Sequence, residues 1–133
     1  MRNRLLAISL TVVGALLGAV PLFAHHGYAN YDTEKKVTLK GTVTKWIWSN
    51  PHCLLMLDVT DDSGKITNFA FEMGPPNGLQ RSGWTRNTMH VGDVVIVEGT
   101  LAKDGSNQAN ARSVTLAGTG KKLGAASSEN NTP

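Results

Sequence analysis

The 133-residue sequence has a single cysteine, 6% aromatic residues and nearly balanced charge. One cysteine cannot form an internal disulfide, so the fold must depend on its hydrophobic core. The chain is also too short for two domains of ordinary size. It contains no Gly-x-Ser-x-Gly elbow, no Walker loop and no dinucleotide-binding glycine pattern. These absences exclude a multidomain enzyme, and we expect no catalytic residue.

The N-terminal residues have the pattern of an export signal. Arg2 and Arg4 precede the apolar stretch Leu5–Val20, and the chain then reaches a small residue at Ala24. This pattern is typical of a secretory signal peptide over residues 1–24, although the apolar stretch also approaches the length of an uncleaved membrane anchor. Cleavage would lower the formal charge from +3 to +1, which disfavours nucleic-acid binding. We expect a periplasmic or secreted protein with no stable membrane insertion after cleavage.

The mature chain is expected to be one folded domain between two polar ends. Residues 25–36 form a polar arm, and residues 118–133 form a tail rich in Gly, Ser, Asn and Lys. Neither end has an apolar period, so we expect both to be mobile. The domain itself is expected over residues 37–117.

Within this domain, apolar and polar residues alternate in short segments. Val37–Trp48 alternates throughout, with a bend expected at Gly41, and Cys53, Leu55 and Leu57 share one phase of the next segment. Five strands and a short helix between the third and fourth predict an all-β fold, a small five-stranded Greek-key barrel that is OB-fold-like. A sandwich would need about seven strands. The expected strands are 37–48, 52–60, 66–73, 94–99 and 109–116.

Histidine is the residue type that carries the most chemical information. Cleavage after Ala24 would give His25 a free α-amine, which together with its imidazole forms a chelate suited to Cu(II). Cleavage after Phe23 would leave an N-terminus that also binds Cu(II). The structural alternative is that His25 and His26 form a solvated arm and that His52 stabilises a turn.

Two further histidines could meet this arm. His52 is expected at the end of the barrel together with Glu72 and Met73, whereas His90 is expected at the opposite end. An extended arm of twelve residues spans roughly 40 Å, so it could reach His52 or stay near His90.

The remaining side chains of interest have structural interpretations. Cys53 lies among apolar residues, so we expect it to be a buried small hydrophobe. The tryptophans could form an exposed aromatic platform, but we expect them to close the end of the barrel, because few basic residues lie among them. These side chains are Trp46, Trp48 and Trp84, with Pro75 and Pro76 nearby.

Several segments of the mature chain resemble DUF6152, a family of secreted bacterial proteins of unknown function. The resemblance implies that His25, His26 and His52 correspond to histidines of the family pattern, but it implies no activity. Gly27 replaces the usual serine, and Cys53 replaces a small apolar residue. The matching segments are Ala24–Tyr28, Val37–Val43, Trp48–His52, Gly74–Asn77, and Gly105–Asn107 with Ala111–Arg112.

Together these patterns predict a monomeric, non-enzymatic binding module that holds one Cu(II) ion. The expected ligands are the amino terminus and imidazole of His25 with the imidazole of His52, and His26 is an alternative or supporting ligand. The second hypothesis is an accessory protein without metal, which docks onto a periplasmic redox or transport complex as its protein partner. Docking would use Trp48, Trp84 and the loop Gly74–Gly83.

Overall fold

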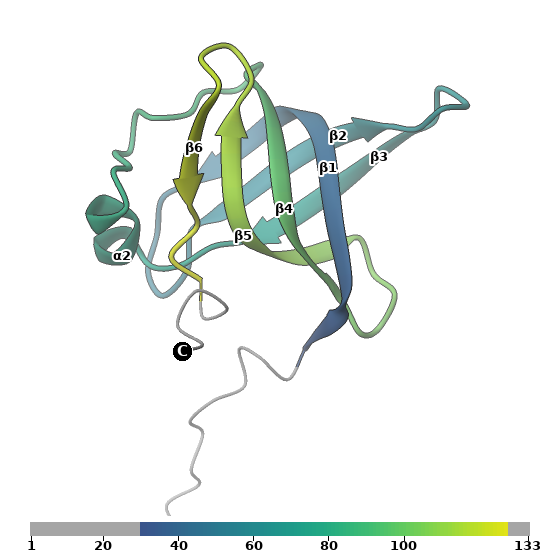
Figure 1. The fold of residues 1–133 in the computed structure, drawn as a ribbon, viewed down its shortest axis with the longest axis horizontal. Helices are drawn as coiled ribbons and strands as arrows, with labels where there is room; N and C mark the ends of the chain where they lie inside the picture. The colour runs from purple at the N-terminus through teal and green to yellow at the C-terminus, as the bar shows by residue number, and fades with distance from the viewer. Residues whose placement is uncertain (1–29, 128–133) are drawn as a thin grey trace, which may run out of the picture.

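The computed structural model describes residues 30–127, which form six β-strands and one short helix (Figure 1). The expected all-β class is confirmed, and the helix α2 (Pro76–Arg81) lies between the third and fourth strands as predicted. No helix within residues 30–127 is long and apolar enough to cross a membrane. The strands are β1 (Tyr31–Ile47), β2 (Leu54–Thr60), β3 (Ile66–Glu72), β4 (Val94–Ala102), β5 (Gln108–Leu116) and β6 (Lys121–Gly124).

The strand pairings of the described chain form a ring. Neighbouring strands follow the order β3-β2-β1-β4-β5-β6, and the pairs in that order are antiparallel. An additional parallel pairing joins β3 to β5, with Phe71 opposite Ala109 and Glu72 opposite Asn110 (Figure 1). The pairings therefore lead from β3 through β2, β1, β4 and β5 back to β3.

The inward-facing side chains of these strands form the hydrophobic core. Successive residues of a strand point to opposite faces, so the alternation in the sequence places every second side chain inside. Cys53, Leu55 and Leu57 are fully buried, as their shared phase predicted. Burial of each large apolar side chain stabilises the fold by about 1.5–3 kcal/mol. The other core side chains on the strands include Val43, Phe71, Val95, Val97, Ala109, Ala111 and Val114.

The long first strand is curved, as its sequence predicted (Figure 1). β1 pairs with β4 along its residues up to Thr42 and with β2 from Thr42 onward. It therefore joins β2 on one side of the ring to β4 on the other. Its register against β2 shifts between Val43 and Lys45. Such a bulge bends a strand and increases its twist, which allows β1 to turn from one partner to the other.

β1 begins earlier than the sequence predicted. We expected a polar arm over residues 25–36, but the strand starts at Tyr31, which pairs with Ala102 of β4. The residues that follow Tyr31 are polar and mostly exposed, so no apolar alternation marked them as a strand. Backbone pairing and the burial of the Tyr31 ring hold this segment instead. The rest of the expected arm, including His25 and His26, lies outside the described residues.

The expectation of five strands was wrong, because the segment expected to be a tail contains β6. This strand pairs with β5, and its buried residue Leu123 lies opposite Val114. The turn before it uses Gly120, whose φ of 74° lies in the left-handed region that glycine tolerates. A four-residue strand with one buried apolar side chain has no period to detect in the sequence. Residues 128–133 lie outside the described residues.

We predict that a side chain at Gly41 would destabilise the fold. A Cβ atom built there lies 2.7 Å from the carbonyl oxygen of Asp58, a backbone atom of the paired strand. Gly41→Ala should therefore lower the free energy of unfolding by about 1–3 kcal/mol, the usual cost of overpacking, in urea denaturation. Gly118→Ala is the control, because nothing lies within 4 Å of its added Cβ. Equal losses in the two variants would contradict the steric explanation.

Candidate functional site

His52 lies in the loop between β1 and β2, and this loop is attached to the end of β3. Its backbone carbonyl accepts a hydrogen bond from Ser49 Oγ at 3.1 Å. The next residue, Cys53, accepts from the Met73 amide and donates to the Gly74 carbonyl. These backbone bonds hold His52 beside the end of β3, as the sequence predicted. Its side chain is 45% exposed, so its imidazole is available to a ligand.

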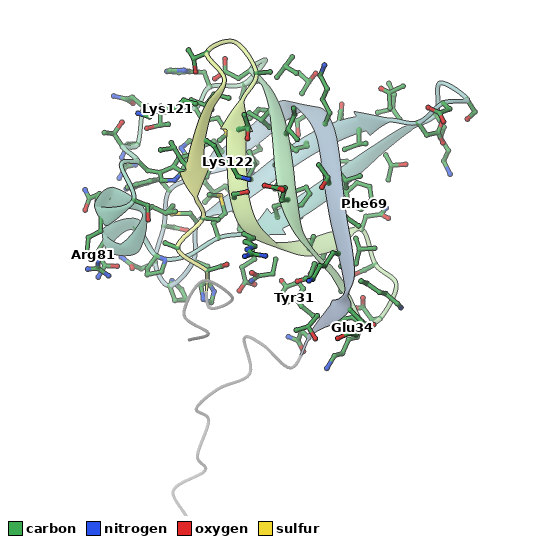
Figure 2. All side chains as sticks on the ribbon, in the orientation of Figure 1. Tyr31, Glu34, Phe69, Arg81, Lys121 and Lys122 are labelled. Atoms are coloured by element: carbon green, nitrogen blue, oxygen red, sulfur yellow. The ribbon has the colours of Figure 1, made fainter. Side chains whose placement is uncertain are left out.

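Glu72, the last residue of β3, links His52 to the start of the described chain. Glu72 Oε1 lies 3.4 Å from His52 Nδ1. Its other oxygen, Oε2, accepts a hydrogen bond from the Tyr31 hydroxyl at 3.1 Å. Figure 2 shows Tyr31 at the end of the molecule where the described chain begins. The structure thus brings together three residues that are far apart in the sequence, and Tyr31 was not expected among them.

The environment of Tyr31 strongly favours its neutral form. The ring is 7% exposed, and burial raises the pKa of the phenol well above its ordinary value. The nearby negative charge of Glu72 and the hydrogen bond to it raise the pKa further. Tyr31 therefore acts as a hydrogen-bond donor that fixes the Glu72 carboxylate.

A hollow of about 190 Å³ lies beside these residues, and we call it the His52 hollow. Two of its lining residues, Asn110 and Ser127, each have a buried side-chain oxygen, Oδ1 and Oγ respectively, with no hydrogen-bond partner among residues 30–127. Both residues are only 3% exposed. Buried oxygens of this kind normally have a partner, so the hollow is suited to a hydrogen-bonding ligand. Its lining consists of His52, Glu72, Met73, Gly74, Pro75, Asn110, Ala126 and Ser127.

The chain after β6 forms one wall of the His52 hollow. The Gly74 amide donates to the Ala125 carbonyl at 2.9 Å, and the Ala125 amide donates to the Arg112 carbonyl at 2.9 Å. A Cβ atom on Gly74 would lie 2.1 Å from the Ala126 carbonyl oxygen, so this close approach requires glycine. The approach places Ser127 beside Glu72 and Asn110.

The sequence did not identify Asn110 or Ser127 as site residues. Asn110 gave no signal, because a polar residue between Ala109 and Ala111 is what an alternating strand shows, and its burial appears only in the structure. Ser127 gave no signal, because its position depends on β6 and on the close contact at Gly74.

The position of Tyr31 shows which of the two histidines, His52 or His90, lies near the start of the described chain. The chain that carries His25 and His26 reaches the described fold beside Glu72, and hence beside His52. His90 Nδ1 instead lies 3.8 Å from Asp93 Oδ2, in a turn whose backbone pairs with Val43, far along β1 from Tyr31. The described chain therefore begins beside Glu72, the residue that faces His52.

His25 and His26 themselves lie outside the described residues. Residue 25 precedes Tyr31 by six positions, and an extended chain spans at most about 3.3–3.6 Å per residue, or roughly 20 Å. Residues 30–127 contain no group of three or more His, Cys, Asp or Glu side chains that could hold a metal ion. His52 would therefore need ligands from outside residues 30–127 to complete a metal site.

The tryptophans pack against the core. Trp84 is 1% exposed, and its indole Nε1 donates to the Gly124 carbonyl at 2.9 Å. Trp46 stacks on Trp84 with ring centroids 5.6 Å apart, and Trp48 packs on Trp46 at 5.8 Å. This arrangement agrees with the expectation that these rings close one end of the set of strands. It also leaves Trp84 inaccessible to a docking partner.

Cys53 is also part of the core. It is fully buried, and burial raises the pKa of its thiol above the ordinary value. Its Sγ lies 3.8 Å from the Ser49 carbonyl oxygen. These surroundings agree with a packing role, because a nucleophilic thiol needs a lowered pKa and access to solvent.

The match of the chain to known families can now be added to this geometry. A model described as "Family of unknown function (DUF6152)" matches residues 14–112. The chain belongs to the DUF6152 family. No curated protein and no solved structure matches it. In this DUF6152 member, the matched residues include His52, Glu72 and Asn110 of the hollow, whereas Ser127 lies beyond them.

We predict that ionisation of Tyr31 destabilises this DUF6152 protein at high pH. Because the phenol pKa is raised on folding, the folded chain keeps a proton that the unfolded chain loses above about pH 10. The stability contributed by Tyr31 is present below that pH and falls by up to about 1.4 kcal/mol per pH unit above it. Urea denaturation between about pH 9 and 11.5 measures how the free energy of unfolding declines with pH. Tyr31→Phe should remove the part of this decline that Tyr31 causes.

Tyr28→Phe is the control for this prediction, since Tyr28 is the other of the two tyrosines in the sequence. It lies outside the described residues. The assignment to Tyr31 would be contradicted if Tyr28→Phe reduced the pH dependence of the free energy of unfolding equally, or if Tyr31→Phe left it unchanged.

Proposed function

We propose that the mature protein is an exported, non-enzymatic module that binds one Cu(II) ion. The ligands are the amino group and imidazole of His25 and the imidazole of His52, with His26 as an alternative or supporting ligand. The observation that carries the proposal is the chain of contacts Tyr31–Glu72–His52, in which the start of β1 lies against the carboxylate that faces His52. β1 thus begins close to the proposed ligand His52, which supports a role for the residues that precede it in the sequence.

The contact with Glu72 favours His52 as a metal ligand. A metal-binding histidine commonly uses one ring nitrogen for the metal and directs the other toward a carboxylate, which fixes the tautomer and the ring orientation. Glu72 lies on the Nδ1 side of His52, so Nε2 is the nitrogen that remains for the metal. Tyr31 in turn fixes the carboxylate by its hydrogen bond to Oε2. Glu72 is therefore a positioning residue.

The donor set favours copper over other divalent ions. An amine and two imidazoles provide three nitrogen ligands, and Cu(II) exceeds Zn(II) in affinity for such sites and accepts tetragonal geometry with open positions. The amine becomes available only if the signal peptide over residues 1–24 is removed. Export before folding would mean that the metal is acquired outside the cytoplasm.

We also infer that the fold is the OB-type Greek-key barrel that the sequence predicted, extended by β6. The support is the ring of pairings through β3, β2, β1, β4 and β5, which is the strand order of that barrel. In such a barrel the loop between the first two strands lies at a ligand-binding end. His52 belongs to that loop.

The copper proposal predicts a large loss of Cu(II) affinity when either the His52 imidazole or the α-amine of His25 is removed as a ligand. Processed protein that begins at His25 should bind one Cu(II), measured by competitive titration against a chelator. His52→Ala and acetylation of the α-amine should each weaken binding by at least about tenfold, because each removes a nitrogen ligand. His90→Ala is the control and should bind like the wild type. Unchanged binding in His52→Ala or in the acetylated chain would contradict this ligand set.

A separate prediction concerns Glu72. Glu72→Ala should weaken Cu(II) binding by about 10–100-fold, the usual effect of removing a carboxylate that orients a histidine ligand. The matched control is Glu98→Ala, which removes a carboxylate that pairs with Lys122 and lies outside the His52 hollow. Similar losses in both variants would show that the effect is not specific to the partner of His52.

A further inference from the structure

We infer that the His52 hollow is a second binding site, one for a compact protonated primary amine. This site needs no metal ion, and so it goes beyond the proposed copper site. It rests on Asn110 and Ser127, which line this hollow with Glu72 and whose buried side-chain oxygens have no hydrogen-bond partner among residues 30–127. A ligand that donates hydrogen bonds would satisfy both oxygens.

The hydrogen-bonding groups of the lining match an ammonium group. Asn110 Oδ1 is an acceptor, and Ser127 Oγ can accept through its lone pairs. The Glu72 carboxylate has about four lone-pair sites. Its contacts with Tyr31 and His52 therefore leave it further capacity to accept. Three residues with acceptor oxygens, from β3, β5 and the segment after β6, thus line one hollow, and a primary ammonium group has three N–H donors.

The charge of the lining also favours a cation. Glu72 is the one carboxylate among the lining residues, and no lysine or arginine lines the hollow. His52, which faces Glu72, is the one lining residue that can take up a positive charge, and near neutral pH an ordinary histidine is mostly uncharged. An anion would then meet this carboxylate, whereas an ammonium group would form charge-assisted hydrogen bonds, which are about twice as strong as neutral ones. The volume of about 190 Å³ restricts the ligand to a small amine or to the end of a chain.

Two sources could supply this amine. One is a small free amine. The other is the processed N-terminus of this chain, whose α-amine at His25 would be six residues before Tyr31 and within roughly 20 Å of extended chain. Both present the same chemistry to the hollow, so the experiment must separate them.

The test uses the full processed chain with EDTA present, at about pH 7, where primary amines mostly carry their proton and an ordinary histidine is mostly neutral. Methylammonium chloride is added while the side-chain amide resonances of Asn110 are followed by NMR. We expect the chemical shifts of these resonances to change and then saturate, with a dissociation constant of about 10 mM, which is the range that so small a ligand reaches. Tetramethylammonium chloride is the control ligand, because it has the same charge but no N–H donor, and it should cause no change.

Two substitutions test the lining. Glu72→Gln removes the charge but keeps an oxygen for the Tyr31 hydroxyl, and it should weaken methylammonium binding by at least about tenfold. Ser127→Ala should also weaken binding, without loss of stability, since its hydroxyl has no partner in the described chain. Ser106→Ala is the matched control, because the Ser106 hydroxyl is also buried but lies outside the hollow. It should bind like the wild type.

Acetylation of the α-amine separates the two sources. If the processed N-terminus fills the hollow, acetylation alone shifts the Asn110 resonances, and methylammonium binds only to the acetylated chain. If the ligand is a free amine, both forms bind methylammonium equally. The inference is overturned if neither form shows binding that Ser127→Ala weakens, because water alone would then satisfy the oxygens. No metal is present, so the copper proposal can fail without affecting this result.

Discussion

The parallel pairing of β3 with β5 is the constraint on which the site depends. It places Glu72 opposite Asn110 and closes the ring of strands, so that residues from both ends of the chain meet at one place. Four antiparallel pairs join consecutive strands, but β1–β4 and this parallel pairing join strands that are separated along the chain, in the parallel case by α2 and β4. Without it, Glu72 would lie at an open sheet edge, and the wall of the hollow formed by β5 would be absent.

Local patterns predicted the fold where apolar residues alternate, and they failed where the strands are polar. The phase of Cys53, Leu55 and Leu57 gave the core face of β2, and the turn residues between β2 and β3 gave the hairpin. The start of β1 and all of β6 carry mainly charged or small side chains. These segments are strands because a neighbouring strand offers backbone partners, and a sequence pattern does not contain that information.

The site could be predicted only in part, for a related reason. The meeting of His52 with Glu72 followed from the strand ends on either side of one hairpin, which is a local relation. Tyr31 and Ser127 come from the two ends of the described chain and reach the site through long-range pairing. Asn110 could not have been identified either, because a polar residue between two alanines fits an alternating strand, and only the structure shows that its side chain is buried.

The unpartnered oxygen of Asn110 also bears on function. A buried oxygen without a partner costs about 1–3 kcal/mol, a cost that alanine at this position would avoid. The chain instead places two such oxygens beside a carboxylate that Tyr31 already holds in position. Local rules of stability are broken mainly at functional sites, where a ligand supplies the missing interaction. The concentration of these exceptions in one small hollow beside His52 therefore favours this end of the molecule as the place where the protein binds its ligands.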